Sequence, residues 1–442
     1  MATAPQQPET LGAPMESTTA MPRQAATDVS PVTFPLNTAL PDEVGMCPQR
    51  TARLLAVLQS EIDEKRLPGA VVLISRHGKV AVFESLGEQN PQANTPMARD
   101  SIFRIYSMTK PIVSVAVMML MEQGRVLLDD PVSKHLPEFA AQQVAAMREG
   151  GGEFTLRPPH RPVTVQDLLR HTAGLTYEFM GNLPVHKQYA QARIGSRHRS
   201  NAEFSQALAA LPLLVDPGSV WEYSRATDVL GRLVEVVSGQ ALGMFLKEKI
   251  LQPLGMHETA FSVPAAQHGR IAEPFAHDPD GGVPMPMIDI RVEAAMASGG
   301  GGLASTATDY ARFLQFMLNK GELDGVRLLG PRTVEFMTAD HLGDIPVNPA
   351  GVASHLLPPG HGFGLGFAVR TSAGLAAVPG SVGLYYWGGI AGTTFFVDPA
   401  QNMFALMMIQ APNQRDYYRP LFRSLVYAAL LDAPPSHQDF TP

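Results

Sequence analysis

Apolar, strand-like segments lie near both ends of this chain and constrain its fold most strongly. Ala70 to Ser75 and Lys79 to Glu84 predict a hairpin near the start. Four more predicted strands lie toward the other end: Phe363 to Arg370, Ser381 to Trp387, Thr393 to Val397 and Met403 to Ile409. One sheet assembled from the two ends, with helices inserted between them, satisfies this distribution. The sequence therefore predicts an α/β fold.

The middle of the chain has helical periodicity and helix-capping signals. Thr164 and Asp167 form a predicted capping box, and the helix at Ala226 to Val237 has an apolar face and ends at Gly239. We expect an α/β lobe over residues 43–110 and 296–435, a mainly helical lobe over 111–295, and a disordered tail over 1–42. The active site is expected in the cleft between the two lobes.

Composition excludes several classes of function. Lys plus Arg number 34 against 41 Asp plus Glu, and no basic cluster suits nucleic acid. Cys47 is the single cysteine, so no disulfide can form within the chain. No apolar run spans a membrane and no secretory signal is recognisable, so we expect a cytoplasmic protein. The histidines form no metal-binding motif, and no metal or cofactor is expected.

Ser107 and Lys110 stand at the predicted start of a helix and are the first candidates for chemistry. Residues three apart share one helix face, so the hydroxyl and the amine lie side by side. An adjacent amine can take the proton of a serine nucleophile, and the helix start favours negative charge. The alternative is that Ser107 caps the helix while Lys110 is solvated.

Two later segments supply further candidates. Tyr223 lies on a loop or helix entry, where it could share a proton with Lys110 or be a packed aromatic residue. Trp387, Gly388 and Gly389 lie at a predicted strand edge. Paired glycines allow close approach to backbone N–H groups, as an oxyanion site requires, although a tight turn explains them equally well.

These segments, taken together, resemble a known family. Ser107 to Lys110, Tyr223 to Arg225 and Trp387 to Gly389 occur in the order of the three motifs of the serine β-lactamase and penicillin-binding protein superfamily. The chain more closely resembles the class C β-lactamase-like esterases, called family VIII carboxylesterases. Supporting similarity lies in Leu168 to Leu175, Pro253 to Met256 and Gly299 to Leu303, and the resemblance spans about residues 45 to 430.

The resemblance implies roles for individual residues. Ser107 would be the acylated nucleophile, and Lys110 and Tyr223 would form the proton-transfer pair. The backbone N–H groups of Ser107 and Ile390 would form the oxyanion hole. The implied fold is β-lactamase-like, with an antiparallel sheet and an inserted helical lobe. The implied activity is hydrolysis of carboxylic esters with short to medium acyl chains.

The chain departs from the β-lactamase pattern at two positions. Trp387 replaces the lysine that begins the third motif and that can grip a substrate carboxylate. An indole offers apolar surface instead of charge, which favours neutral esters and makes Trp387, Gly388 and Gly389 candidate substrate-binding residues. Arg225 replaces the asparagine of the second motif, and it could bind an anion or point to solvent.

Three other functions stay open on the sequence alone. An acyltransferase of the same architecture would pass the acyl group to an alcohol instead of water. A β-lactamase or D-amino-acid peptidase would turn over nitrocefin or a D-amino-acid peptide, but the tryptophan at 387 predicts weak activity. A non-enzymatic binding protein would leave the Ser107 set unused. The expected partner is a small ester substrate, without nucleic acid or membrane, and the sequence does not indicate the oligomeric state.

Overall fold

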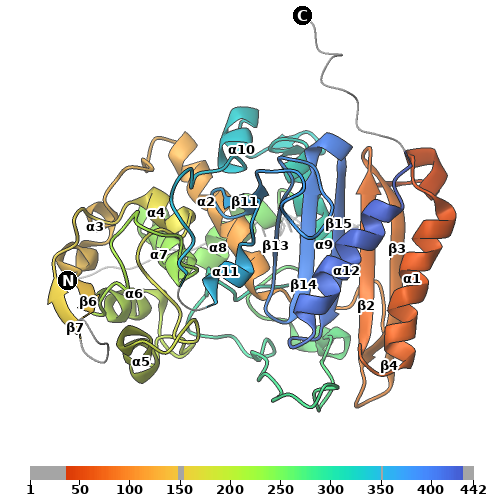
Figure 1. Cartoon of the computed structure of the whole chain (residues 1–442), viewed down its shortest axis with the longest axis horizontal. Coiled ribbons are helices and arrows are strands. Elements are labelled where there is room, and N and C mark those ends of the chain that lie inside the picture. Colours follow the sequence, from red (N-terminus) through yellow and green to blue (C-terminus); the bar gives the residue numbers. More distant parts are fainter. Residues whose placement is uncertain (1–35, 148–153, 350–351, 432–442) are drawn as a thin grey trace, which may run out of the picture. The chain divides into compact units, whose positions relative to one another are not determined.

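The central sheet joins the two ends of the chain, as the strand distribution predicts. The computed structural model describes residues 36–147, 154–349 and 352–431. Across the sheet the strands are β1 (Asn37–Thr38), β3 (Lys79–Asn90), β2 (Gly69–Arg76), β15 (Met403–Gln410), β14 (Gly392–Asp398), β13 (Tyr385–Gly388), β12 (Ala368–Arg370) and β11 (His361–Phe363). The β15 strand pairs antiparallel with β2, so the C-terminal strands complete a sheet begun near residue 69 (Figure 1).

Helices cover both faces of this sheet. Every residue of β2 and β15 is buried, as expected for strands covered on two sides. Helices α1 (Pro48–Asp63) and α12 (Arg415–Ala428) pack together, and their apolar side chains share one core with Val72 and Ile74 of β2. Helix α9 (Ala307–Leu318) also packs against β2 and β15. The alternation of side chains along β2 therefore places Val71 and Leu73 on the face opposite Val72 and Ile74.

The predicted helical segment contains most of the remaining helices. They are α2 (Thr109–Glu122), α3 (Val132–His135), α4 (Val165–Leu169), α5 (Pro184–Gln191), α6 (Asn201–Ala209), α7 (Ala226–Ser238) and α8 (Leu242–Leu246). Helices α10 (Pro331–Met337) and α11 (Ala353–Leu356) follow α9. Short strand pairs join β5 (Phe103–Arg104) to β8 (Ala304–Ser305), β6 (Val144–Met147) to β7 (Phe154–Arg157), and β9 (Glu322–Leu323) to β10 (Val326–Arg327), and β4 (Thr95–Pro96) pairs with β3.

Helices α2 and α7 lie against each other, and this contact positions the candidate site. Ten consecutive positions of α2, from Pro111 to Leu120, are buried, so the helix is enclosed on all sides. Helix α7 ends in the left-handed Gly239, as predicted. The N-terminal ends of α2 and α7 carry the Ser107 and Tyr223 motifs just ahead of them. Packing of the two helices therefore brings together segments more than a hundred residues apart.

Two expectations need correction. The segment predicted as one strand over 363–370 forms the two antiparallel strands β11 and β12. Gly364 and Gly366 explain the break, because Gly366 has a φ of 105° and a Cβ at Gly364 would lie 2.4 Å from the Met337 carbonyl oxygen. Part of the tail predicted over residues 1–42 is structured, since β1 at Asn37–Thr38 pairs in parallel with β3. Residues 1–35 of that tail lie outside the described residues.

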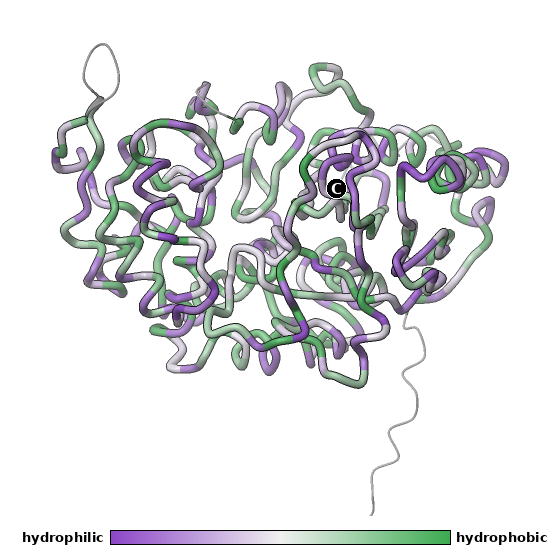
Figure 2. The backbone as a smooth tube through the Cα atoms, turned by 90° about the horizontal axis from the view of Figure 1, so that it is seen from below, coloured by the Kyte–Doolittle hydropathy of each residue, from purple (hydrophilic) through white to green (hydrophobic). Residues whose placement is uncertain are grey.

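From Leu36 onward the chain forms one compact unit by its contacts, and the lobe boundaries near residues 110 and 296 stay predictions. Figure 2 shows hydrophobic and hydrophilic residues interleaved along the backbone of this unit. In the described part of the chain no single helix is long and apolar enough to cross a membrane. Only the Ala226–Ser238 and Leu242–Leu251 helices taken together reach that length and composition, and they are bent by 80°.

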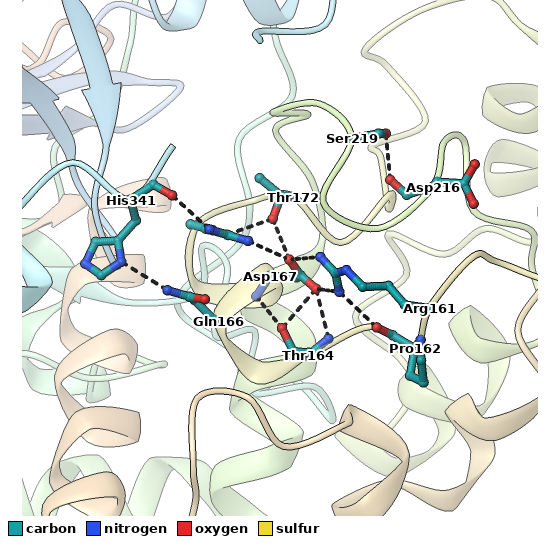
Figure 3. A network of polar contacts seen from close by, with 10 residues as sticks. Arg161, Pro162, Thr164, Gln166, Asp167, Thr172, Asp216, Ser219 and His341 are labelled. Carbon is teal, nitrogen blue, oxygen red and sulfur yellow. Dashed lines mark hydrogen bonds and ion pairs between the residues drawn. The ribbon is translucent and has the colours of Figure 1, made fainter. Parts of the chain in front are cut away.

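Asp167 anchors the segment that leads from α4 to the candidate site (Figure 3). Its fully buried carboxylate accepts hydrogen bonds from the side chains of Arg161 at 2.5 and 2.9 Å, Thr172 at 2.8 Å and Arg170 at 3.2 Å. The backbone and hydroxyl of Thr164 also donate to it, which confirms the predicted capping box. Burial opposes ionisation, but these donors together lower the pKa of Asp167.

Replacing Asp167 by alanine should lower the free energy of unfolding by about 3–5 kcal/mol, because Arg170 and two threonines lose a buried, charged acceptor. Urea denaturation monitored by circular dichroism measures the change. Since the folded-state pKa of Asp167 lies below its ordinary 3.8, this stability is present above that pH and is lost as the pH falls. The matched control is Asp216→Ala, whose carboxylate is 16% exposed and should contribute only about 1 kcal/mol or less. Equal losses for the two variants would contradict the prediction.

Candidate active site

Ser107 lies in a one-turn 3-10 helix, η2 (Tyr106–Met108), directly ahead of α2. The sequence placed it in the first turn of the α-helix itself, and the structure moves the helix start to Thr109. Tyr106 has a φ of 44°, a conformation that costs a bulky residue roughly 1–3 kcal/mol. Neighbouring elements hold this turn: the Ile288 N–H donates to the Tyr106 hydroxyl at 2.9 Å, and the Tyr310 hydroxyl donates to the Met108 carbonyl at 2.9 Å.

Lys110 meets Ser107 as the three-residue spacing predicts. The Lys110 Nζ lies 3.2 Å from the Ser107 Oγ, 3.0 Å from the Tyr177 hydroxyl and 2.6 Å from the Gly300 carbonyl oxygen. An ammonium group has three N–H donors, and each of these oxygens can accept one. The Lys110 side chain is fully buried, so it is a fixed part of the site and not the solvated residue of the alternative interpretation.

The surroundings of Lys110 determine its charge. Burial disfavours the ammonium form, but the hydroxyl oxygens of Tyr177 and Tyr223 outweigh it and raise the pKa of Lys110. The Nζ atom also lies 4.6 Å from the centre of the Tyr223 ring, where a cation is attracted to the aromatic face. The upward shift comes from the two tyrosine oxygens, so Lys110 keeps its proton when one of these tyrosines is a phenolate.

Tyr223 and Trp387 are brought together beside Lys110. Tyr223 precedes α7, and Trp387 lies on β13, so the two come from opposite ends of the fold. The Trp387 Nε1–H donates to the Tyr223 hydroxyl oxygen at 3.2 Å, and the ring centres are 5.2 Å apart. Trp387 is only 5% exposed. The indole is thus largely buried and donates to Tyr223, and the predicted role of Trp387 in substrate binding stays a prediction.

Tyr177 belongs to the site and was missed by the sequence analysis. Its hydroxyl accepts a hydrogen bond from Lys110 at 3.0 Å, and its ring lies 5.5 Å from that of Tyr223. Burial raises the pKa of Tyr177 to about 12, although the Lys110 charge opposes the shift. One feature of the sequence could have indicated Tyr177: it lies two residues after the Leu168–Leu175 segment, which resembles the family.

The turn after β13 approaches the nucleophile closely. A Cβ at Gly389 would lie 2.4 Å from the carbonyl oxygen of Ile105, two residues before Ser107. Glycine is thus required for this approach, and it places Ile390 near η2. Within the described residues, the turn, cap and loop hydrogen bonds do not use the backbone N–H groups of Ser107 or Ile390. Oxyanion binding is the role that the resemblance gives to these two N–H groups, and it stays a prediction.

Arg225 is paired within the protein. Its guanidinium donates to Glu178 at 2.6 and 3.3 Å and lies 3.6 Å from Asp228, and its side chain is 12% exposed. It also stacks over the Tyr177 ring, with Cζ at 4.8 Å from the ring centre. Of the two alternatives, anion binding or a solvent-directed charge, the structure favours neither, because two carboxylates already balance this charge.

His171 packs beside the site as a neutral group. Its Nδ1 lies 3.3 Å from the Ser224 Oγ, and its ring centre is 4.8 Å from that of Tyr223. Burial, followed by the Lys110 charge, holds the pKa of His171 well below its ordinary value. An uncharged imidazole at this position supports the Tyr223 ring. Over the described ranges, no group of three His, Cys, Asp or Glu side chains is arranged to hold a metal ion.

Comparisons with known proteins agree with this geometry. Residues 54–428 match the protein-family model described as Beta-lactamase. Esterase EstB of Burkholderia gladioli is 35% identical over 379 residues, which cover 81% of this chain and 89% of EstB. The solved structure of EstCE1, a hydrolase with promiscuous acyltransferase activity, aligns with a TM-score of 0.71 at 30% identity and covers 86% of this chain and 98% of that one. Unliganded simvastatin synthase LovD of Aspergillus terreus aligns with a TM-score of 0.70 at 26% identity over 87% of this chain and 99% of LovD.

Proposed function

Because the chain belongs to the beta-lactamase family, we propose that it hydrolyses carboxylic esters through an acyl-enzyme formed on Ser107. Its relatives include the esterase EstB and a lovastatin esterase of Penicillium rubens, and the chain is an ester hydrolase or acyltransferase with this fold. The proposal for Ser107 rests on one observation. The Ser107 hydroxyl contacts the charged Lys110 amine, which also donates a hydrogen bond to the Tyr177 hydroxyl.

Tyr223 is the proposed proton acceptor. Lys110 is charged and donates its protons to three oxygens, so it holds the site electrostatically and does not itself accept the serine proton. The negative charge of the Tyr223 phenolate, the form that can accept a proton, is stabilised by this ammonium and by the Trp387 N–H. Tyr223 thus acts as the base, and Lys110 supplies the positive charge that stabilises it.

In the proposed reaction Tyr223 acts in its phenolate form. Ser107 Oγ attacks the ester carbonyl carbon while its proton moves to the Tyr223 oxygen, which becomes a neutral hydroxyl. The carbonyl oxygen takes the negative charge and is bound by the N–H groups of Ser107 and Ile390. The tetrahedral intermediate collapses, the C–O bond to the alcohol breaks, and the alcohol leaves with the proton from Tyr223. Water then attacks the acyl-enzyme by the same steps and releases the acid and Ser107.

The charge distribution favours neutral esters. Trp387 supplies no cation where a β-lactamase has lysine, and Arg225 is balanced by Glu178 and Asp228. A substrate carboxylate would therefore lose its hydration without gaining a charged partner. Esters with short to medium acyl chains fit this environment, in preference to β-lactams or D-amino-acid peptides.

Acyl transfer is the second candidate function. EstCE1 is described as a hydrolase with promiscuous acyltransferase activity, and two further relatives are the acyltransferase mokF of Monascus pilosus and the methylbutanoyltransferase of Aspergillus terreus. An alcohol in place of water would complete the same cycle. Product analysis with p-nitrophenyl butyrate and a primary alcohol distinguishes the two, because an ester that exceeds free butyrate would favour transfer.

A phosphonate probe tests the nucleophile without knowledge of the natural substrate. Wild-type protein treated with a p-nitrophenyl alkylphosphonate should gain one phosphonyl group, detected by intact-mass spectrometry, and Ser107→Ala should gain none. Peptide mapping should place the adduct on Ser107. Unmodified wild-type protein, or equal labelling of Ser107→Ala, would overturn the proposed nucleophile.

A further inference from the structure

The turn that carries the proposed oxyanion donor is held by a residue of α12. Arg419 Nη2 donates a hydrogen bond to the carbonyl oxygen of Gly389. The N–H of Gly392 donates to the same oxygen at 3.0 Å, and the Gly389 N–H donates to the Thr393 carbonyl at 2.8 Å. Hydrogen bonds therefore hold both the N–H and the C=O of Gly389, and the carbonyl oxygen accepts two of them.

The carbonyl of Gly389 and the N–H of Ile390 belong to one peptide unit. A trans peptide is planar, and its C=O and N–H point in opposite directions. Donors on the carbonyl oxygen consequently determine where the N–H of Ile390 points. Resting on the function proposed above, we propose that Arg419 is a positioning residue of the oxyanion hole, which orients and polarises this peptide so that Ile390 N–H faces the ester oxygen.

The second glycine of the motif makes room for this contact. A Cβ at Gly388 would lie 2.8 Å from both Cζ and Nη2 of Arg419, closer than real Cβ contacts allow. The same Cβ would lie 2.8 Å from the Thr393 carbonyl oxygen. Gly388 thus admits the guanidinium, and Gly389 admits the Ile105 carbonyl. The paired glycines therefore accommodate protein groups, and their predicted role in substrate binding stays a prediction.

In the described part of the chain, the charge on Arg419 is not paired with a carboxylate. Among the ion pairs of the described residues, none includes Arg419, although Arg415 and Asp416 precede it on the same helix. Burial lowers the pKa of Arg419 to about 10, which still leaves the group protonated at neutral pH. In a partly buried position an uncompensated cation polarises the peptide that it binds, and it strengthens the hydrogen bond that the peptide N–H can donate. The same charge favours an oxyanion nearby.

Two substitutions at this position test the proposal with p-nitrophenyl butyrate. Arg419→Met should lower kcat by about 10- to 100-fold, since removal of an oxyanion donor costs about 10²- to 10³-fold and here the donor is misaligned and not removed. KM should change by less than about threefold, because the ground-state ester makes weaker use of the hole. Arg419→Lys retains the charge and one donor, and should recover most of the lost kcat.

Inhibitor binding separates an oxyanion effect from a general structural one. A trifluoromethyl ketone that carries the butyryl group forms a tetrahedral oxyanion on Ser107, and its inhibition constant should rise by the factor by which kcat/KM falls. The inhibition constant of butyrate, which forms no such adduct, should stay constant. A kcat of Arg419→Met within about threefold of wild type, or equal changes in both inhibition constants, would overturn the proposal.

Arg423→Met is the matched control. Arg423 lies four residues later on α12 and is buried, whereas Arg419 is partly exposed. Arg423 contacts the ring of Tyr386, with Cζ 4.2 Å from the ring centre. Its substitution should leave kcat and the ketone affinity near the wild-type values, and an equal loss in both variants would assign the effect to packing of α12. Failure of the proposed function is recognised separately, because wild-type protein would then form neither the ketone adduct nor the phosphonyl adduct.

Discussion

Substituting Ser107 by alanine is expected to lower kcat/KM for p-nitrophenyl butyrate by about 10⁴- to 10⁶-fold, the largest effect of any single change in this chain. The Ser107 Oγ is the protein atom that forms a covalent bond to the acyl group in the proposed mechanism, so its removal abolishes the acyl-enzyme pathway. The oxyanion donors and the binding site remain, and they should sustain a small residual rate. Stopped-flow absorbance should show a burst of p-nitrophenol for wild type if deacylation is slower than acylation, and none for the variant.

Ser114→Ala provides the matched control for this experiment. Ser114 lies two turns further along α2 and is buried, but it contacts the glycine at 366 and not the site. Its loss should leave kcat/KM within about threefold of wild type. A Ser107→Ala protein that retains more than about 1% of wild-type activity would remove Ser107 from the mechanism, since the residual rate from binding and oxyanion donors alone is far smaller.

The second large effect is expected for Lys110→Met, which should lower kcat by about 10²- to 10⁴-fold. Methionine fills a similar volume, but it removes the charge that stabilises the phenolate form of Tyr223 and the donor that contacts Ser107 at 3.2 Å. The Lys110 charge also opposes the upward shift in the pKa of Tyr177. The same ammonium lies 4.6 Å from the ring centre of Tyr223 and stabilises the phenolate form of this proposed base, so without it the residual activity should increase toward higher pH than that of wild type.

A pH–rate profile between pH 6 and 10 measures both effects. Lys134→Met serves as the control, because Lys134 is exposed and forms an ion pair with Asp130 in the predicted helical lobe. It should alter neither kcat nor the profile. A Lys110→Met variant with wild-type kcat would show that the ammonium is dispensable, and the assignment of Tyr223 as a base stabilised by that charge would then fail.

The part of the site predicted from sequence is the part fixed by local geometry. Ser107 and Lys110 meet because a three-residue spacing in helical backbone places them together, and this holds even though the first turn is a 3-10 helix. The assembly of one sheet from two distant sets of strands also followed from period-two patterns and their positions in the chain. The capping box at Thr164 is local in the same sense.

The part that sequence did not predict depends on tertiary contacts. Tyr177 reaches Lys110 from a loop, and no periodicity or spacing indicates which of many tyrosines will do so. Trp387 lies on a strand, but whether its indole faces substrate or Tyr223 is decided by the packing of Phe363 and Tyr223 against it. The uncompensated charge of Arg419 and its contact with Gly389 likewise arise only when α12 docks on the sheet.

The order of strands in the sheet also governs when the protein can become active during its synthesis. The β2 strand forms its hydrogen bonds on one side with β15, which follows it by most of the length of the chain. Until β15 leaves the ribosome, β2 presents an unpaired and largely apolar edge that can pair with other chains. Such distant pairing delays folding because the intervening chain must first be closed into a loop. The nascent protein is therefore prone to aggregation for much of its synthesis. The Ile390 turn joins the Ser107 helix only near the end of that synthesis.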